Sequence, residues 1–282
     1  MTSKVGRVSF GRIIAYALAI VLLLIVVTPF ITAIVSTFKN TEDFYGTSYV
    51  WLPSKWNWHN YIDTWNWTTY GRFMFNSVVC AVLVTIFATL VSSMAAFGFA
   101  RIHFFGRNVI FYLVLLTQGV PFMVLFVPTY LMMNKMGLLN SYWGLILPLI
   151  SFPTGTFMMR QAMIAIPMDY EYAAKIDGCN RFTMFWRVFL PLVKNTLIAL
   201  GIFTFMSSWN NYLWPLVVVS QRDMYTLPLG LQLYSNTRAV GSRPEWNMIL
   251  CAAVMSALPI LIVYCFMSRR LMEGITLGGI KG

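Results

Sequence analysis

Six long stretches without a charged residue constrain the fold of this chain more than any other feature. They are residues 13–38, 73–100, 108–134, 136–159, 195–221 and 246–268. A helix needs about 20 mostly apolar residues to cross the hydrocarbon core of a bilayer, and each stretch is long enough. Of the 282 residues, 59% are hydrophobic and 10% are charged, whereas a soluble domain has roughly 25% charged residues. The sequence therefore predicts an all-α integral membrane protein, a single transmembrane domain over residues 1–282 with helices at about 13–38, 74–100, 108–133, 142–166, 195–220 and 246–268.

Basic residues near the ends of these helices predict their orientation. The first stretch is too long for a cleaved signal peptide and lacks a small-residue cleavage site, so we interpret it as an anchor with Lys4, Arg7 and Arg12 in the cytoplasm. Six spans then place both termini in the cytoplasm. Most of the 20 Lys and Arg residues fall on that side, as the positive-inside rule requires. The net charge of +11 thus indicates orientation in a membrane rather than binding to nucleic acid.

Charges of both signs crowd together in segment 167–191, between the fourth and fifth stretches. Asp169 is a candidate N-cap for a first short helix, and Glu171 in its first turn suits the positive end of the helix dipole. Gly178 can adopt the left-handed conformation that closes a helix C-terminus. We therefore expect this helix to end at Asp177.

A second helix is expected directly after this turn. Asn180 is its candidate N-cap, and Pro191 ends or kinks it. The residues between them form one apolar face at helical spacing, namely Phe182, Phe185, Trp186 and Phe189. Such a helical pair at the membrane edge either packs on its own bundle or offers a surface on which a partner docks, and the residue pattern leaves both open.

Two adjacent asparagines interrupt the fifth stretch. An amide inside a bilayer is costly unless it faces protein or water. Amides bind sugar hydroxyls, and aromatic rings stack on the apolar face of a sugar ring. We therefore predict a substrate pathway in which Asn210 faces the cavity, with hydrogen bonding between helices as the alternative. The predicted pathway residues are Trp209, Asn210, Asn211, Tyr212 and, from the third stretch, Gln118.

Prolines in the third and fourth stretches predict bends. A proline frees a backbone carbonyl and bends a spanning helix. The residues concerned are Pro121, Pro128, Pro148 and Pro153.

No pattern in the sequence indicates chemistry within this chain. The four cysteines show no paired spacing, so we interpret them as packing residues; His59 and His103 are isolated, and no phosphate-binding loop or dinucleotide fingerprint is present. We predict no catalytic or metal site and no cofactor. A membrane enzyme would need a nucleophile, base or metal cluster, and a secondary transporter usually places ionisable residues at mid-membrane, so both classes are disfavoured.

The run Tyr172 to Gly178, followed by a basic and aromatic helix and the Leu190-Pro191 pair, resembles the EAA loop of ABC importer permeases. The resemblance is closest to the carbohydrate-uptake branch typified by the second maltose permease subunit. One position departs from the motif, because Tyr172 stands where a glutamate usually precedes the two alanines, and Glu171 lies one place earlier. One residue is about 100° around a helix, so the role of this glutamate is open.

The resemblance implies a permease subunit of an importer in a bacterial or archaeal cytoplasmic membrane, moving a sugar or oligosaccharide inward. Segment 167–191 would then be the cytoplasmic coupling loop, and the C-terminal tail, 269–282, would contact the ATPase. The coupling residues would be Glu171, Tyr172, Ala173, Ala174, Asp177 and Gly178, and those of the tail Gly278, Gly279 and Lys281.

The partners implied by the same resemblance are a second permease subunit, two ATPase subunits that bind ATP and magnesium, an extracytoplasmic solute-binding protein and membrane lipid. Nucleic acid is not among them. The alternative is a permease of the same superfamily that carries an amino acid, a polyamine or a phosphodiester.

Overall fold

The computed structural model describes residues 10–46, 50–67, 69–238 and 243–276. Over these residues the chain is helical and contains no β-strand, which confirms the predicted all-α class. The chain divides into two compact units, one of residues 1–67 and 233–255 and the other of residues 68–232 and 256–282. Each unit is described by itself.

The first unit is tied together by a buried amide. Asn60 is 3% exposed, and its Nδ2 donates to the carbonyl oxygens of Thr37 and Lys39 at 2.7 and 2.9 Å. The Asn60 Oδ1 accepts from Asn247 Nδ2 at 3.3 Å. These bonds join the segment that follows α1 (Phe10–Ser36), helix α2 (His59–Asn66) and the start of α14 (Trp246–Thr276). The short helix η1 (Thr41–Phe44) belongs to the same unit.

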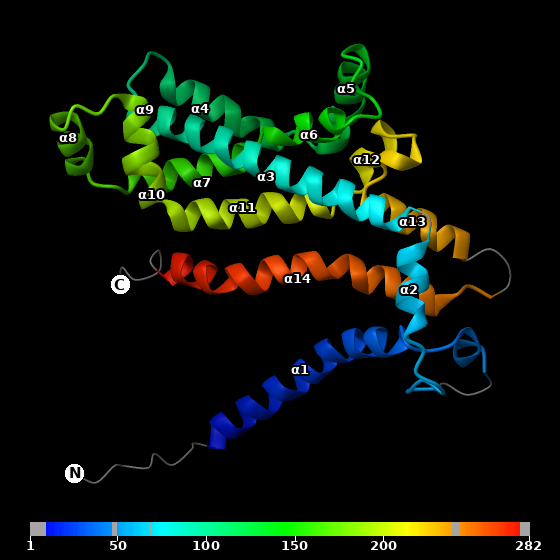
Figure 1. Cartoon of the computed structure of the whole chain (residues 1–282). Coiled ribbons are helices and arrows are strands. Elements are labelled where there is room, and N and C mark those ends of the chain that lie inside the picture. The colour runs from blue at the N-terminus through cyan, green and yellow to red at the C-terminus, as the bar shows by residue number, and fades with distance from the viewer. Residues whose placement is uncertain (1–9, 47–49, 68, 239–242, 277–282) are drawn as a thin grey trace, which may run out of the picture. The chain divides into compact units, whose positions relative to one another are not determined.

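The second unit is built around the long helix α3 (Tyr70–Arg101), which packs against α6 (Tyr142–Ile150), α7 (Pro153–Ile164) and α11 (Lys194–Trp209) (Figure 1). Small residues allow these helices to approach closely. A Cβ atom on Gly155 of α7 would lie only 2.7 Å from Leu200 and 2.9 Å from the Ser92 hydroxyl. The packing of α7 on α3 and α11 therefore requires a glycine here.

The remaining helical elements that belong wholly or partly to this unit are shorter. Figure 1 shows α8, α9 and α10 at one end of α3, and α5 and α12 at the other. The shorter elements are α4 (Arg107–Leu116), η2 (Thr117–Gly119), α5 (Phe122–Lys135), α8 (Asp169–Ile176), α9 (Arg181–Met184), the π-helix η3 (Phe185–Phe189), α10 (Leu190–Leu192), α12 (Leu213–Val218), η4 (Arg222–Met224) and α13 (Leu227–Arg238).

The predicted third and fourth spans are broken rather than continuous. The third bends by 101° between η2 and α5, at Pro121, and the fourth is interrupted between α6 and α7, before Pro153. Proline lacks an N–H and forces the preceding residue out of the helical region. Bending at prolines was expected, but the predicted continuous helices 108–133 and 142–166 are wrong.

The fifth span is broken as well, and the sixth is longer than predicted. Residues 210–212 separate α11 from α12, so a continuous helix over 195–220 is wrong. In contrast, α14 continues to Thr276, beyond the predicted end at 268. Of the tail glycines only Gly274 lies within this extension, and one glycine costs about 1 kcal/mol in a helix, which does not end it.

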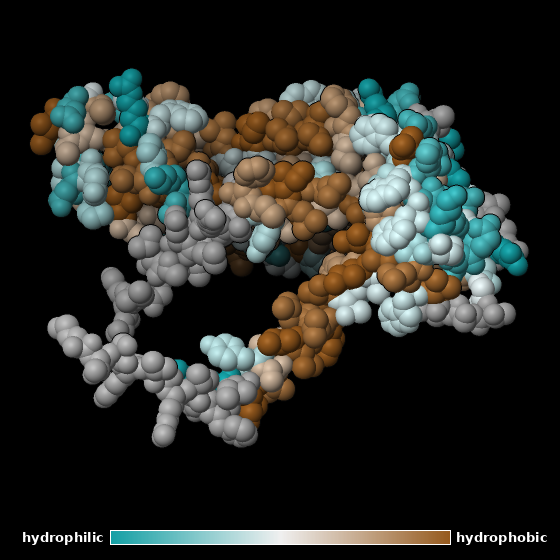
Figure 2. Space-filling model, turned by 60° about the horizontal axis from the view of Figure 1, so that its bottom comes forward, coloured by the Kyte–Doolittle hydropathy of each residue, from teal (hydrophilic) through white to brown (hydrophobic). Residues whose placement is uncertain are grey.

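Three helices of the described residues are long and apolar enough to cross a membrane, or up to five if each bent pair counts as one span. Apolar side chains cover their outer surfaces; Ile25 of α1, for example, is 64% exposed. Figure 2 shows this apolar surface in brown along the helices, with hydrophilic side chains gathered near the helix ends. An exposed apolar surface along whole helices is what a lipid environment requires.

Candidate functional site

The segment 167–191 begins with helix α8, whose two ends differ from each other in how well they were predicted. Met168, not Asp169, is the N-cap residue, and no side chain caps this end, so the predicted capping role of Asp169 is wrong. Asp169 is instead the first helical residue, where its charge complements the helix dipole. At the other end Asp177 is the C-cap residue and Gly178 has a φ of 74°, as predicted.

The second helix of this segment is capped as predicted, but its apolar face is divided. The Asn180 side chain accepts from the Thr183 amide at 2.8 Å. Phe185 and Phe189 are buried, whereas Phe182 is 66% and Trp186 is 40% exposed. Pro191 cannot donate a hydrogen bond, and the helix widens to the π-helix η3 just before it. A wider turn changes which residues share a face.

Helix α8 presents aromatic and aliphatic side chains to the outside. Tyr170 is 48%, Tyr172 is 54% and Ile176 is 87% exposed, and Phe182 and Trp186 are exposed on the following helix. Large exposed apolar side chains are candidates for contact with a partner. We call this group, Tyr170, Tyr172, Ile176, Phe182 and Trp186, the α8 surface.

The six predicted coupling residues separate into two sets. Tyr172, Ala173, Asp177 and Gly178 are exposed, whereas Glu171 is 5% and Ala174 is 4% exposed. Ala174 packs into a cluster of apolar residues from α3, α7 and η3. The Glu171 carboxylate forms ion pairs with Lys175, 2.8 Å away, and with Arg101, 3.9 Å away. Glu171 therefore faces the chain itself.

Most of the predicted pathway residues of the fifth stretch make hydrogen bonds within the protein, at or near the break between α11 and α12. Trp209 is 3% exposed, and its indole N–H donates to the Ser256 carbonyl at 3.3 Å. Asn210 is exposed and donates to the Met206 carbonyl at 3.0 Å. Asn211 accepts from the Trp214 amide, in the first turn of α12, at 3.3 Å, and the N-cap residue of that helix is Tyr212. Because α11 ends at Trp209, the expectation that both asparagines lie within one helix is wrong.

The two remaining pathway residues lie elsewhere. Tyr212 is partly buried and packs against the apolar cluster around α3, α6 and α12. Gln118 is exposed, and its Oε1 accepts from the Thr154 hydroxyl at 2.7 Å. None of the five predicted pathway residues is among those that line the pocket described next.

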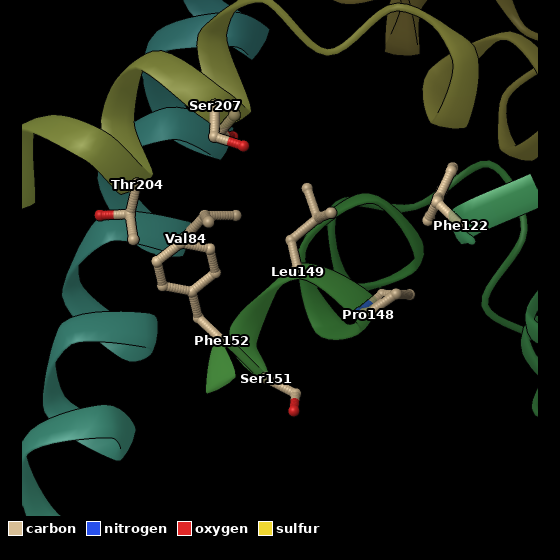
Figure 3. A pocket seen from close by; sticks show the side chains of 9 residues that line it. Val84, Phe122, Pro148, Leu149, Ser151, Phe152, Thr204 and Ser207 are labelled. Atoms are coloured by element: carbon tan, nitrogen blue, oxygen red, sulfur yellow. The ribbon is translucent and has the colours of Figure 1, made fainter. Parts of the chain in front are cut away.

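A pocket of about 180 Å³ lies where the breaks of the third and fourth stretches approach α3 and α11. Its polar groups are hydroxyls, and no charged residue lines it. The Thr204 hydroxyl bonds to the Leu200 and Gly201 carbonyls of its own helix at 3.0 Å, whereas Figure 3 shows the Ser207 oxygen directed into the open space. The lining residues are Val84, Phe122, Pro148, Leu149, Ser151, Phe152, Thr204, Ser207 and Ser208.

Sequence reasoning missed this hydroxyl group. Its signal was the adjacent Ser207-Ser208 pair, which precedes Trp209 inside a charge-free stretch. The asparagines that follow are the stronger polar signal. The substrate pathway was therefore predicted at residues 209–212, beside the break between α11 and α12, and not at the serines.

Within the described residues, no three His, Cys, Asp or Glu side chains are grouped so that they could hold a metal ion. The four cysteines, all among the described residues, form no disulfide with one another. Cys80 and Cys251 are buried, in keeping with the packing role expected for them, and Cys265 is exposed.

Residues 88–269 match the protein family described as binding-protein-dependent transport system inner membrane component. This range includes α7, the whole segment 167–191 and the hydroxyl-lined pocket apart from Val84. The chain belongs to this family. As a family member it is an inner-membrane transport component, which agrees with the resemblance found in the sequence.

Curated relatives of this permease match over nearly their whole length. It is 35% identical over 265 residues to the arabinooligosaccharides transport system permease protein AraQ of Halalkalibacterium halodurans, covering 92% of each chain. It is 31% identical over 269 residues to the sn-glycerol-3-phosphate transport system permease protein UgpE of Yersinia pestis, covering 93% of this chain and 95% of the relative.

The permease fold is also found in a solved structure. A chain of a bacterial ABC transporter involved in the import of the acidic polysaccharide alginate superposes with a TM-score of 0.82, at 22% identity, over 94% of this chain and 99% of that one. The likeness supports the fold of the permease. The predicted tail contacts Gly278, Gly279 and Lys281 lie outside the described residues.

Proposed function

We propose that this chain is one permease subunit of an ABC importer that moves a neutral sugar or oligosaccharide inward across a bacterial or archaeal cytoplasmic membrane. The α8 surface carries this proposal. Tyr172 and Ile176 are exposed on it, and the helix that carries them ends in a tight turn at Gly178. The surface lies at the end of the bundle opposite α5 and α12. A separate ATPase would dock on this surface, and its closure would be transmitted to α3, α7 and α11.

The proposed assembly contains a second permease subunit, two ATPase subunits that hold ATP and magnesium, and an extracytoplasmic solute-binding protein. The family description supports the last of these, because it names transport that depends on a binding protein. Six spans with both termini in the cytoplasm would place segment 167–191 on the ATPase side. Gly278, Gly279 and Lys281 of the tail would reach the ATPase as well.

The lining of the pocket supports a neutral solute. Hydroxyls of Ser207 and Ser208 and the rings of Phe122 and Phe152 provide hydrogen bonds and apolar surface, the two kinds of contact that a sugar ring needs. The pocket is smaller than the roughly 300–1,000 Å³ of typical ligand sites. We infer that this subunit holds one part of the solute and that the second permease subunit holds the rest.

The second candidate is a permease for an anionic solute such as a glycerol phosphate, which the likeness to UgpE favours. Binding of a phosphate group usually involves a basic side chain or a helix N-terminus. Because no basic residue is among the lining residues, an anionic solute would need its cation from the partner subunit.

The deciding experiment is to purify the assembled importer with its partner subunits and to measure ATPase activity and uptake in liposomes. Neutral oligosaccharides and sn-glycerol 3-phosphate would be supplied with their binding proteins. We expect stimulation and uptake with a neutral sugar. Uptake of the phosphate alone would support the second candidate, and uptake without ATP would contradict the proposal.

The tail contact has its own test. Deletion of residues 278–282 should lower the stimulated ATPase activity while the amount of assembled complex holds, because the segment lies beyond the last span. Unchanged stimulation would show that the tail is dispensable for coupling.

A further inference from the structure

Arg101, the last residue of α3, is 5% exposed although it carries a charge. Its guanidinium donates to the carbonyl oxygens of Met163 and Ile166, at the C-terminal end of α7. It also lies over the ring of Phe189 in η3, 4.7 Å from the centroid. Carbonyls at a helix C-terminus have no partner within the helix, and a cation complements the dipole there. Arg101 thus joins the ends of α3 and α7.

Glu171 brings α8 to the same point. Its Oε2 lies 3.9 Å from Arg101 Nη1 and makes no hydrogen bond within the described residues. Lys175 also pairs with Glu171, but its side chain is 53% exposed. Water screens such an ion pair, so it contributes little to stability. A buried carboxylate needs an opposite charge nearby. Of the two basic residues beside Glu171, Arg101 is the one that is buried.

We propose that Arg101 is a positioning residue, which attaches the coupling helix α8 to α3 and α7 through Glu171. This inference rests on the coupling role proposed above for α8. It also explains the departure from the EAA motif: the glutamate at 171 is turned inward to Arg101, and the ATPase would meet Tyr172, which is 54% exposed, instead of a carboxylate.

The chemistry of this position favours arginine over lysine. The planar guanidinium presents five N–H donors in fixed directions, so one side chain can bond to carbonyls at the end of α7 while its charge lies 3.9 Å from a carboxylate on α8. A lysine ammonium is a compact point charge on a flexible stem. Arg101→Lys should therefore restore the charge but only part of the attachment.

The attachment can be tested without any transport assay. Ala174 of α8 is 4% exposed, so a cysteine placed there in a chain lacking Cys80, Cys179, Cys251 and Cys265 should react slowly with a maleimide. In the assembled importer, Arg101→Met should raise the labelling rate at position 174 by at least about fivefold, and Arg101→Lys by less. An unchanged rate with Arg101→Met would overturn the attachment.

The matched control is Arg160→Met. Arg160 of α7 donates to the Phe99 carbonyl at 3.3 Å and lies 4.1 Å from the Phe111 centroid, so it also joins helices, but no carboxylate of the described residues pairs with it. Labelling at position 174 should not change in this variant. An equal rise in both variants would mean general loosening of the bundle and would contradict the specific role of Arg101.

The effect on coupling is measured in liposomes as ATPase stimulation by the loaded binding protein, per assembled complex. Coupling free energies typically correspond to 5- to 150-fold, so Arg101→Met and Glu171→Gln should each lower stimulation by at least about fivefold, and the double variant by no more than either alone. Additive losses would overturn the pairing. If labelling responds as expected while the wild-type importer shows no stimulation by any sugar, the proposed function fails and the attachment stands.

Discussion

Gly178 is the residue on which the turn after α8 depends. Its φ is 74°, and a Cβ atom added there would meet nothing within 4 Å. Backbone conformation rather than space therefore selects glycine. At the same scale, Ser207 matters through one hydroxyl that points into the pocket.

Gly178→Val should lower transport while the amount of protein in the membrane holds. A β-branched residue at this φ costs on the order of 1–3 kcal/mol, which the turn relieves by moving α8, whereas the spans insert on their own hydrophobicity. Asparagine tolerates the left-handed region better, so Gly178→Asn is the matched control and should retain more uptake. Normal uptake with valine would refute the coupling role of the turn.

Ser207→Ala should raise the sugar concentration needed for half-maximal uptake. Loss of one hydrogen bond to a sugar hydroxyl costs about 0.5–1.5 kcal/mol, or roughly two- to tenfold in affinity. Thr204→Val removes a hydroxyl that already bonds within its own helix, so it should leave the concentration dependence unchanged. Equal shifts in both variants would indicate that the solute senses pocket shape and not the Ser207 hydroxyl.

At the scale of elements, the breaks in the spans decide what the bundle can do. Pro121 and Pro153 lie at the breaks of the third and fourth stretches, where α5 and α7 begin, and α11 ends at Trp209, before residues 210–212. Two of these breaks approach the pocket. Broken spans are tolerated in a membrane only where the freed backbone groups are buried in protein or face water. We therefore expect broken helix ends to border a pocket, as two of them do.

Asn211→Ala should destabilise α12, because it removes the side chain that accepts from the Trp214 amide. The loss of one such hydrogen bond costs about 0.5–1.5 kcal/mol. We expect a lower melting temperature and less assembled complex. Asn211→Asp keeps the acceptor and should preserve both quantities, as should Asn210→Ala, whose side chain is exposed. Equal destabilisation by Asn210→Ala would argue against the role of the Asn211 side chain as acceptor for the Trp214 amide.

At the scale of the whole molecule, orientation follows from charge. Lys and Arg outnumber Asp and Glu by 20 to 9, and under the six-span proposal most basic residues lie inside. The α8 surface then faces the cytoplasm. A reversed orientation would place that surface where no ATPase could reach it.

Single cysteines at Ser54, Arg107 and Ser235, in a chain without its four native cysteines, report this orientation. Positions 54 and 235 should react with an impermeant maleimide added outside intact cells, and position 107 only after permeabilisation. The expectation rests on the positive-inside rule. Labelling of position 107 alone in intact cells would show that the topology is the reverse of the one proposed.

The sequence alone determined the class of the protein and much of the local structure of segment 167–191. Apolar stretches of spanning length need no tertiary context, because each must bury its surface in lipid. The turn at Gly178 and the Asn180 cap were predictable too, since they depend on local backbone geometry. The family resemblance rested on the same local run of residues.

Only the tertiary structure decided which side chains turn inward. Glu171 and Tyr172 are neighbours in sequence, yet Glu171 is buried and Tyr172 is 54% exposed. Glu171 lies beside the buried Arg101, 70 positions away in the chain, and no local pattern indicates that contact. The pocket likewise needs α3, α5, α6 and α11 together. Local patterns determine where helices form and how they are capped. Contacts between distant segments determine which face of each helix is buried, exposed or part of the pocket.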